Sequence, residues 1–101
     1  MPAPEKAGSP AYKIFETRQF LRDLARLAPE VQKRLEVKLR TYVYPVLRQT
    51  PRYGPNTKRL RNWEPTAWRY RVGDWRFFYE IDDGKRVVSM IAADHRRQAY
   101  R

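Results

Sequence analysis

Three arginines on either side of a tight turn are the residues of this sequence best suited to chemistry. Arg69, Arg71 and Arg76 lie within residues 68–81, a run rich in aromatic and β-branched residues that Gly73-Asp74 interrupts. This pattern predicts a β-hairpin with a two-residue turn. Counting back from the turn pairs Arg71 with Arg76 and gathers the three arginines on one face. Guanidinium groups keep their protons near neutral pH, so these residues would bind and stabilise anions.

The arginine face of this hairpin lacks an evident acidic partner. Like charges directly opposite on a sheet destabilise it by a few tenths to about 1 kcal/mol per pair. Glu80 lies at the far end of the arm and Asp74 lies in the turn, so neither is expected beside the arginines. An anion would relieve the repulsion between Arg71 and Arg76, whereas the alternative is an ordinary solvated sheet surface. The opposite, apolar face is predicted to hold Trp68, Tyr70, Val72, Trp75, Phe77 and Tyr79.

The only histidine, His95, is expected near the arginine-bearing end of the sheet. Asp82-Asp83-Gly84 is a second turn signal, and residues 87–93 have the composition of a further strand. If that strand pairs antiparallel with the second arm of the hairpin, residues 94–101 return to the first turn. A lone histidine is more often structural, but a pKa near 6.5 also suits proton transfer. Tyr100 would either join this site or act as a hydrophobic plug for the C-terminus.

Two helices are predicted between a first strand and the hairpin. Residues 11–17 alternate as a short strand, and Thr17 can then cap a helix. Ala28-Pro29 ends that helix and begins a longer one, in which Pro45 is expected to kink or fray the last turn. Both helices must bury apolar stripes, and the apolar face of the hairpin is the available partner. The predicted stripes are Phe20, Leu21, Leu24 and Leu27, followed by Val31, Leu35, Leu39, Tyr42, Val43 and Val46.

The segment between the second helix and the hairpin is a basic loop. Prolines, Gly54 and asparagines between residues 50 and 66 leave room for at most a short strand at residues 58–61. Cations here are interleaved with Tyr53 and a tryptophan, which is the mixture of charge and stacking surface that single-stranded nucleic acid uses. The alternative is a solvated loop whose aromatics turn inward. The candidate RNA-binding residues of this loop are Arg52, Lys58, Arg59, Arg61 and Trp63.

Length and composition indicate one small, strongly basic α+β domain. The order of elements is an N-terminal strand, a two-helix hairpin and a three- to four-stranded antiparallel sheet, over residues 11–101. The chain has 22 Lys and Arg against 11 Asp and Glu, so its formal charge of +11 indicates a polyanionic or acidic partner. The absence of cysteine excludes disulfides and thiolate metal sites and suits the cytoplasm.

The first ten residues are predicted to be a flexible tail. They contain three prolines, a glycine and a serine, and they lack the charged-then-apolar plan of a signal peptide. No apolar run in the sequence approaches the roughly 20 residues of a membrane-spanning helix. We therefore expect no membrane partner.

Three short motifs in a fixed order resemble the RelE branch of the RelE/ParE toxin superfamily. They are Arg-x-Arg-x-Gly-Asp at residues 69–74, Trp-Arg-x-x-Tyr at 75–79 and His-Arg-Arg-x-x-Tyr at 95–100. Together with the helix pair, the resemblance covers about residues 12–101. It implies a RelE-like microbial ribonuclease fold and the toxin of a type II toxin-antitoxin pair. Such a toxin enters the ribosomal A site and cleaves mRNA by attack of a ribose 2′-OH on the adjacent phosphodiester, without metal or cofactor.

The resemblance also implies partners. A small cognate antitoxin would hold the toxin inactive, and mRNA on the ribosome, with contacts to 16S rRNA, would be its target. The toxin-antitoxin complex would bind operator DNA and repress its own operon.

Roles for individual residues follow from the same resemblance. Relatives carry basic residues at the positions of Arg69 and Arg71, and in some of them a lysine there can act as base. Both are arginine here, so His95 and Tyr100 remain as candidates for proton transfer, and the family pattern favours Tyr100. Arg97 is expected to join the RNA-binding residues. The implied catalytic set is Arg69, Arg71, Arg76, His95, Arg96 and Tyr100.

Two other functions stay open at this point. ParE relatives share the fold but poison DNA gyrase by binding, without cleaving RNA, and a basic surface would suit them as well. They generally lack the full set of basic and tyrosine positions found here. The third possibility is a catalytically inactive protein that only binds RNA or its antitoxin.

Overall fold

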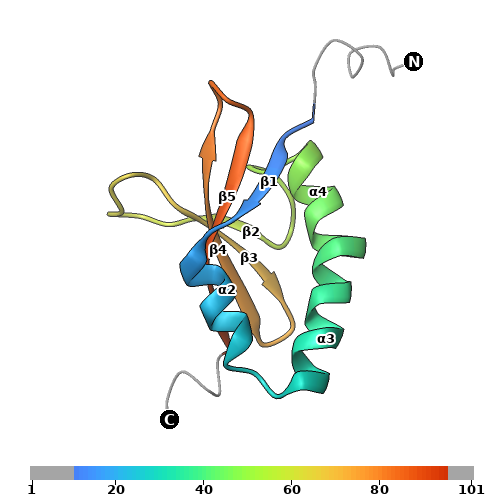
Figure 1. The fold of residues 1–101 in the computed structure, drawn as a ribbon. Helices are drawn as coiled ribbons and strands as arrows, with labels where there is room; N and C mark the ends of the chain where they lie inside the picture. Colours follow the sequence, from blue (N-terminus) through green and yellow to red (C-terminus); the bar gives the residue numbers. More distant parts are fainter. Residues whose placement is uncertain (1–10, 96–101) are drawn as a thin grey trace, which may run out of the picture.

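A mixed sheet with helices packed against one face makes up the part of the chain that the computed structural model describes, residues 11–95 (Figure 1). Predictions for the tail at residues 1–10 and for Arg96, Arg97 and Tyr100 fall outside the described residues. Within them the sheet has five strands in the order β1-β5-β4-β3-β2. The strands are β1 Lys13–Glu16, β2 Thr57–Arg59, β3 Trp68–Val72, β4 Trp75–Asp82 and β5 Val87–His95.

The predicted α+β fold is confirmed, with the N-terminal strand joining the same sheet. Strands β2 to β5 form the antiparallel part, and β1 pairs parallel with β5, from Lys13 beside Val87 to Glu16 beside Met90. The short strand in the basic loop is β2 rather than residues 58–61, because its pairing with β3 ends where Arg59 meets Trp68. No helix within residues 11–95 is long and apolar enough to cross a membrane.

The helices bury the apolar face of the β3–β4 hairpin. α2 spans Arg18–Ala25, and α3 Pro29–Lys38, the π-helical turn η1 Leu39–Val43 and α4 Tyr44–Gln49 form one continuous helix beside the sheet (Figure 1). Phe77 and Tyr79 of β4 are fully buried, and the Phe77 ring meets Phe20 of α2 edge-on. Tyr79 donates a hydrogen bond from its hydroxyl to the Pro51 carbonyl, and burial raises its pKa. The predicted partnership of helices and hairpin is confirmed.

The first helix begins at Thr17, as predicted. The Thr17 hydroxyl accepts a hydrogen bond from the Phe20 N–H and donates one to the Met90 carbonyl on β5. Phe20 and Leu24 are buried, but the prediction that Leu21 lies on the same face is wrong, because 48% of its surface is exposed. One residue along a helix is a rotation of about 100°, which turns Leu21 toward an open groove between α2 and the long helix.

The long helix differs from its predicted form around Pro45. A wide turn at η1, in which the Tyr44 N–H bonds to the Leu39 carbonyl, precedes the proline, and the helix continues to Gln49 without fraying. Proline has no N–H to donate, so the helix lacks one backbone hydrogen bond at Pro45. The wider turn before it accommodates this interruption. It also shifts the apolar stripe. Tyr42, predicted to be buried, is 48% exposed, whereas Tyr44 and Leu47 are buried.

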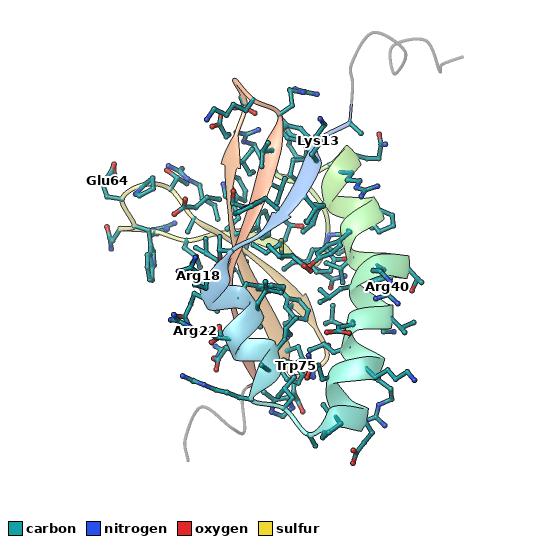
Figure 2. All side chains as sticks on the ribbon, in the orientation of Figure 1. Lys13, Arg18, Arg22, Arg40, Glu64 and Trp75 are labelled. Atoms are coloured by element: carbon teal, nitrogen blue, oxygen red, sulfur yellow. The ribbon has the colours of Figure 1, made fainter. Side chains whose placement is uncertain are left out.

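A loop between β2 and β3 projects away from the body of the protein. Figure 2 shows Glu64 of this loop far from the helices and strands. Trp63 beside it is 58% exposed, and Tyr53 before β2 is 72% exposed. The alternative in which the aromatics of the basic loop turn inward is therefore wrong for both rings.

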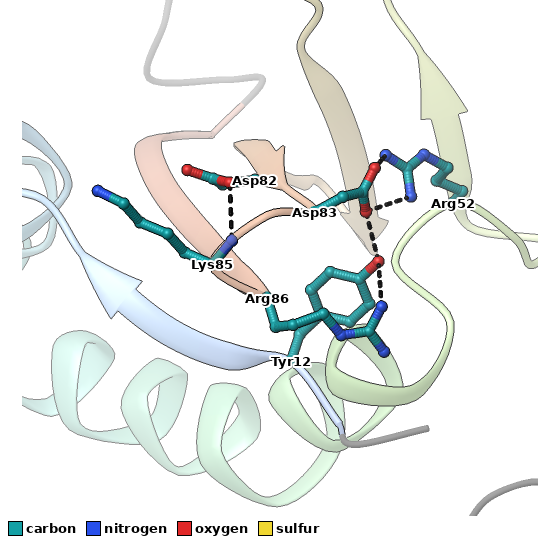
Figure 3. Close-up of polar contacts among 6 residues, drawn as sticks. All are labelled: Tyr12, Arg52, Asp82, Asp83, Lys85 and Arg86. Carbon is teal, nitrogen blue, oxygen red and sulfur yellow. Dashed lines mark hydrogen bonds and ion pairs between the residues drawn. The ribbon is translucent and has the colours of Figure 1, made fainter. Parts of the chain in front are cut away.

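Arg52 is tied to the β4–β5 turn, and its side chain is 34% exposed (Figure 3). Its guanidinium forms two hydrogen bonds to Asp83, at 3.1 and 2.7 Å, and lies 5.9 Å from the Trp68 ring centre. Tyr12 donates a 2.6 Å hydrogen bond to the same carboxylate, and Arg86 stacks over the Tyr12 ring. The arginine holds the pKa of Asp83 below its usual value, with a further contribution from Tyr12. This cluster joins three segments that are far apart in the sequence.

We expect Asp83→Asn to lower the stability of the protein at neutral pH and to remove the part of its pH dependence that Asp83 contributes. Because the folded-state pKa of Asp83 is lowered, its contribution is present above the unfolded pKa of about 3.9 and is lost as the pH falls toward the lowered pKa. Urea unfolding of wild type and variant should differ at pH 7 and converge below about pH 4. Asp74→Asn, in the hairpin turn, is the matched control. An equal gap at every pH would contradict this role for Asp83.

Candidate active site

The sheet face turned away from the helices carries the predicted arginine cluster. The hairpin register is the predicted one, with Arg71 opposite Arg76 and Gly73 at a φ of 58° in the turn. Arg69 lies beside Lys58 of β2 on one side and Phe78 on the other. Alternation along the strands, with Tyr70, Phe77 and Tyr79 buried on the opposite face, puts these cations together. We refer to Lys58, Arg69, Arg71 and Arg76 as the basic face.

Asp94 on β5 is an acidic partner that the sequence analysis missed. Strand β5 pairs antiparallel with β4 as predicted, so Asp94 and His95 do lie at the end of the sheet that holds the hairpin turn. Asp94 lies opposite Arg76 and forms an ion pair with its guanidinium, and each side chain is 34% exposed. The prediction that the arginines lack a carboxylate beside them is therefore wrong for Arg76. The signal was available, because Asp94 directly precedes His95 in the segment expected at this end.

A β-bulge decides which residues of β5 face Arg76. Phe78 pairs with Ala92 while the next residue, Tyr79, pairs with Met90, so β5 contains one extra residue between them. Strict alternation from the buried Met90 would have put residue 94 on the helix side. The bulge reverses this parity, and Asp94 lies on the basic face.

The same bulge places His95 on the other face of the sheet. His95 pairs with Trp75, and the two rings meet edge-on with their centres 4.7 Å apart. Trp75 in turn stacks parallel to Phe77, which belongs to the core. The structure therefore brings His95 to the correct end of the sheet but not among the arginines, since the strand separates its ring from the basic face.

The protein itself does not use all the hydrogen-bonding capacity of the basic face. Within residues 11–95, the buried Nε atoms of Arg69 and Arg76 have no hydrogen-bond partner, whereas Arg71 donates from Nε to the Gly73 carbonyl at 3.3 Å. An unsatisfied buried donor costs about 1–3 kcal/mol. Together with the pairing of Arg71 and Arg76, this indicates a surface that sacrifices stability for concentrated positive charge.

The candidate RNA-binding residues of the basic loop lie in four different places. Lys58 belongs to the basic face, while Arg59 pairs with Trp68 and so lies on the opposite face of β2. Arg61 and Trp63 are exposed on the projecting β2–β3 loop. Arg52 is held by Asp83 at the end of the sheet away from Arg76. Of these five residues, only Lys58 lies next to an arginine of the hairpin, because it pairs with Arg69.

Comparison with known proteins assigns the family. A profile described as "ParE toxin of type II toxin-antitoxin system, parDE" matches residues 14–100. The chain belongs to this ParE toxin family. It is thus a toxin of a type II toxin-antitoxin system within the RelE/ParE superfamily. No curated protein sequence matches the toxin.

Solved structures of RelE proteins share the toxin's fold. A chain of the RelBE2 toxin-antitoxin complex from Mycobacterium tuberculosis is 27% identical, with a TM-score of 0.69 over 87% of the toxin and 94% of that chain. A chain of the intact E. coli RelBE complex is 28% identical, with a TM-score of 0.60 over 84% and 96% of the two chains. An archaeal RelE–RelB complex from Pyrococcus horikoshii OT3, at 23% identity and a TM-score of 0.55, shows likeness of fold alone.

Removing the carboxylate of Asp94 should increase the toxin's affinity for anions. In water, two unit charges about 4 Å apart interact by about 1 kcal/mol, so Asp94→Asn should tighten binding of a 2′-deoxy oligonucleotide by about three- to tenfold. Fluorescence anisotropy at low salt would measure the change. Glu64→Gln on the projecting loop removes the same charge away from the basic face and should have a smaller effect. Equal effects of the two variants would mean that Asp94 does not mask Arg76.

Proposed function

We propose that this toxin is a ribosome-dependent endoribonuclease that cleaves mRNA in the A site. The observation that carries the proposal is the basic face, where four cations lie together on an open sheet and, within residues 11–95, the ion pair to a carboxylate is that of Arg76 with Asp94. The 26–28% identity to RelE chains with solved structures supports the same branch. The toxin would act in the cytoplasm, where the ribosome is.

The proposed reaction needs charge stabilisation above all. Attack of a 2′-OH on the neighbouring phosphorus forms the new P–O bond of a cyclic phosphate and breaks the bond to the 5′-oxygen. Negative charge accumulates on the phosphoryl oxygens in between. Preorganised cations are most effective against charge that develops in the transition state. Arg76 and Arg71 face each other and could contact one phosphoryl group together, while Arg69 and Lys58 would hold the adjacent backbone.

The ion pair between Arg76 and Asp94 fits this use of the basic face. In the free toxin, Asp94 limits the repulsion between Arg76 and Arg71 and fixes the guanidinium at the end of the sheet. Both partners are one-third exposed, so the pair is accessible and weak enough to rearrange. An incoming phosphate would compete with the carboxylate for the same nitrogen atoms.

We assign proton transfer to Tyr100, with Arg96 as a further cation and Arg97 as an RNA contact. These assignments come from the motif at residues 95–100. A group in this segment would have to remove the 2′-OH proton or donate one to the leaving 5′-oxygen. His95 is the alternative, but its contact with Trp75 on the helix side of the sheet makes it the weaker candidate.

Binding to DNA gyrase without RNA cleavage is the second candidate function. The matching family profile is that of ParE toxins, and this observation favours it. Against it, binding to a protein does not require opposed arginines or Nε donors left without partners within residues 11–95. The solved structures that the toxin resembles include RelE–RelB toxin-antitoxin complexes. We therefore propose a cognate antitoxin as the partner of this toxin. Operator DNA would be the target of the toxin-antitoxin complex.

Induced expression of the toxin should stop translation and leave DNA supercoiling unchanged. With purified ribosomes and a defined mRNA, primer extension should detect cleavage in the A site. Arg76→Ala should reduce the cleavage rate about a hundred- to thousandfold, because one preorganised charge opposite the phosphoryl group is lost. Its stability should fall by no more than about 1 kcal/mol, since the lost ion pair is partly exposed.

Arg34→Ala is the matched control, because it removes an exposed arginine from α3 and should leave cleavage unchanged. If the toxin instead causes DNA breaks that are trapped by gyrase and leaves mRNA intact, the ParE mechanism is the correct one. If Arg76→Ala cleaves mRNA at the normal rate, the basic face does not take part in catalysis.

Tyr100→Phe should slow the cleavage step with little change in ribosome affinity, because it deletes a proton-transfer group and keeps the ring. His95→Gln should retain most cleavage, since its ring lies against Trp75 rather than on the basic face. Single-turnover cleavage on programmed ribosomes separates the chemical step from binding. The opposite ranking of the two variants would assign the base to His95.

A further inference from the structure

The ion pair between Asp94 and Arg76 places a carboxylate among the cations that would hold the substrate. Asp94 lies on β5 directly opposite Arg76, and 34% of its side chain is exposed, so a bound nucleotide could contact it. Glu80 is on the same side of β4 by strand alternation, but it lies four residues beyond Arg76, or about 13 Å along the strand. Within residues 11–95, Asp94 is thus the carboxylate that an ion pair ties to the basic face.

The other side chains of the basic face are unsuited to accept a proton. Lys58 and the three arginines of the hairpin are cations that keep their protons near neutral pH. His95 lies across the sheet, where its ring meets Trp75 with the ring centres 4.7 Å apart. An ionised carboxylate has only acceptor oxygens and can take a proton. Asp94 therefore has the chemistry that the neighbouring cations lack.

The backbone next to Asp94 is held by α2. The Ala93 N–H donates a hydrogen bond to the Asp23 carboxylate of α2 at 2.9 Å, and the Gln19 side chain donates another to Asp23 at 2.8 Å. The β-bulge turns the next residue, Asp94, onto the basic face. The position of Asp94 thus depends on α2 and on strand pairing as well as on Arg76. A phosphate that competes for Arg76 would leave this backbone in place.

We propose that Asp94 is the general base of the cleavage reaction and accepts the 2′-OH proton while Arg76 binds the scissile phosphoryl group. The inference rests on the proposed function and supplies a base for it. The buried Nε of Arg76 has no hydrogen-bond partner within residues 11–95, while Nη2 donates to Asp94, so one guanidinium can adjoin both groups. Reacting atoms approach to about 3–3.5 Å before bond formation. A carboxylate beside the phosphate-binding arginine therefore lies within reach of the 2′-oxygen.

The proton and the bonds can be followed through the step. A carboxylate oxygen of Asp94 takes the proton as the 2′-oxygen bonds to phosphorus. The bond from phosphorus to the 5′-oxygen breaks, and Tyr100, the proton-transfer residue of the proposed function, supplies the proton that this oxygen takes up. The products are a 2′,3′-cyclic phosphate and a free 5′-OH. Asp94 then loses its proton to solvent, so base and acid are two different residues.

Single-turnover cleavage on programmed ribosomes tests the assignment. Asp94→Asn should lower the cleavage rate about a hundred- to ten-thousandfold, the usual contribution of a general base. Asparagine keeps an oxygen that can accept from Arg76, so the guanidinium should stay in position. Affinity for a 2′-deoxy oligonucleotide should not fall, which separates loss of the base from loss of binding. Glu80→Gln is the control, because it removes a carboxylate from the same sheet face and should leave cleavage unchanged.

A second substrate separates the base from the acid. In an mRNA whose 5′-oxygen at the cleavage site is replaced by sulfur, the leaving group departs without a proton, because a thiol is more acidic than an alcohol. The defect of Tyr100→Phe should largely disappear on this substrate, whereas the defect of Asp94→Asn should remain. Recovery of Asp94→Asn on the sulfur substrate would overturn the proposal, because Asp94 would then act on the leaving group.

Two further outcomes are decisive. Normal cleavage by Asp94→Asn, with wild-type toxin active, would overturn this inference and leave the proposed function standing. A wild-type toxin that cuts no mRNA on programmed ribosomes would overturn the proposed function, and the role of Asp94 with it. If circular dichroism shows that Asp94→Asn has lost its fold, Asp94→Ser at the same partly exposed position takes its place in each comparison.

Discussion

Burial of the apolar face of the β3–β4 hairpin against the helices is the interaction on which the rest of the structure depends. Tyr70, Phe77 and Tyr79 are almost completely buried, and each large side chain of this kind contributes about 1.5–3 kcal/mol when it leaves water. Side chains alternate along a strand, so burying one face fixes the other. The three arginines of the hairpin are consequently held on the outer face by the burial of their sequence neighbours on the opposite face. The toxin can therefore hold like charges together, because their repulsion is smaller than the energy of the core.

The charged residues have different roles on different surfaces of the toxin, which the net charge of +11 does not reveal. Around Asp83, one carboxylate gathers Arg52 and Tyr12 and is used to join the β4–β5 turn to the rest of the protein. Around Asp94, one carboxylate faces a larger excess of cations and leaves the basic face positive. On α2 the one acid, Asp23, accepts a hydrogen bond from the Ala93 N–H of β5, while Arg18 and Arg22 remain exposed. The first arrangement stabilises the fold, and the other two leave charge available for a polyanion.

Membership of the ParE toxin family, with RelE chains among the structural neighbours, leaves two candidate functions for the toxin. The distinction rests on the outer face of the sheet, where charge is arranged at the spacing of opposed strands. A nuclease requires that arrangement in detail, whereas a protein that only binds gyrase requires surface complementarity.

The sequence by itself determined the local features of this protein. Gly73 and the alternation around it set the register that opposes Arg71 to Arg76, and Thr17 and Pro29 marked the helix starts, because each depends on residues close in the chain. Tertiary structure decided what depends on distant partners. The bulge near Ile91 turned Asp94 toward Arg76 and His95 toward Trp75, and no periodicity in the sequence reveals one extra residue in a strand. Likewise, Arg52 forms an ion pair with Asp83, which lies 31 residues later in the chain. Such a pair forms between charges that the fold brings together, so it depends on the tertiary structure.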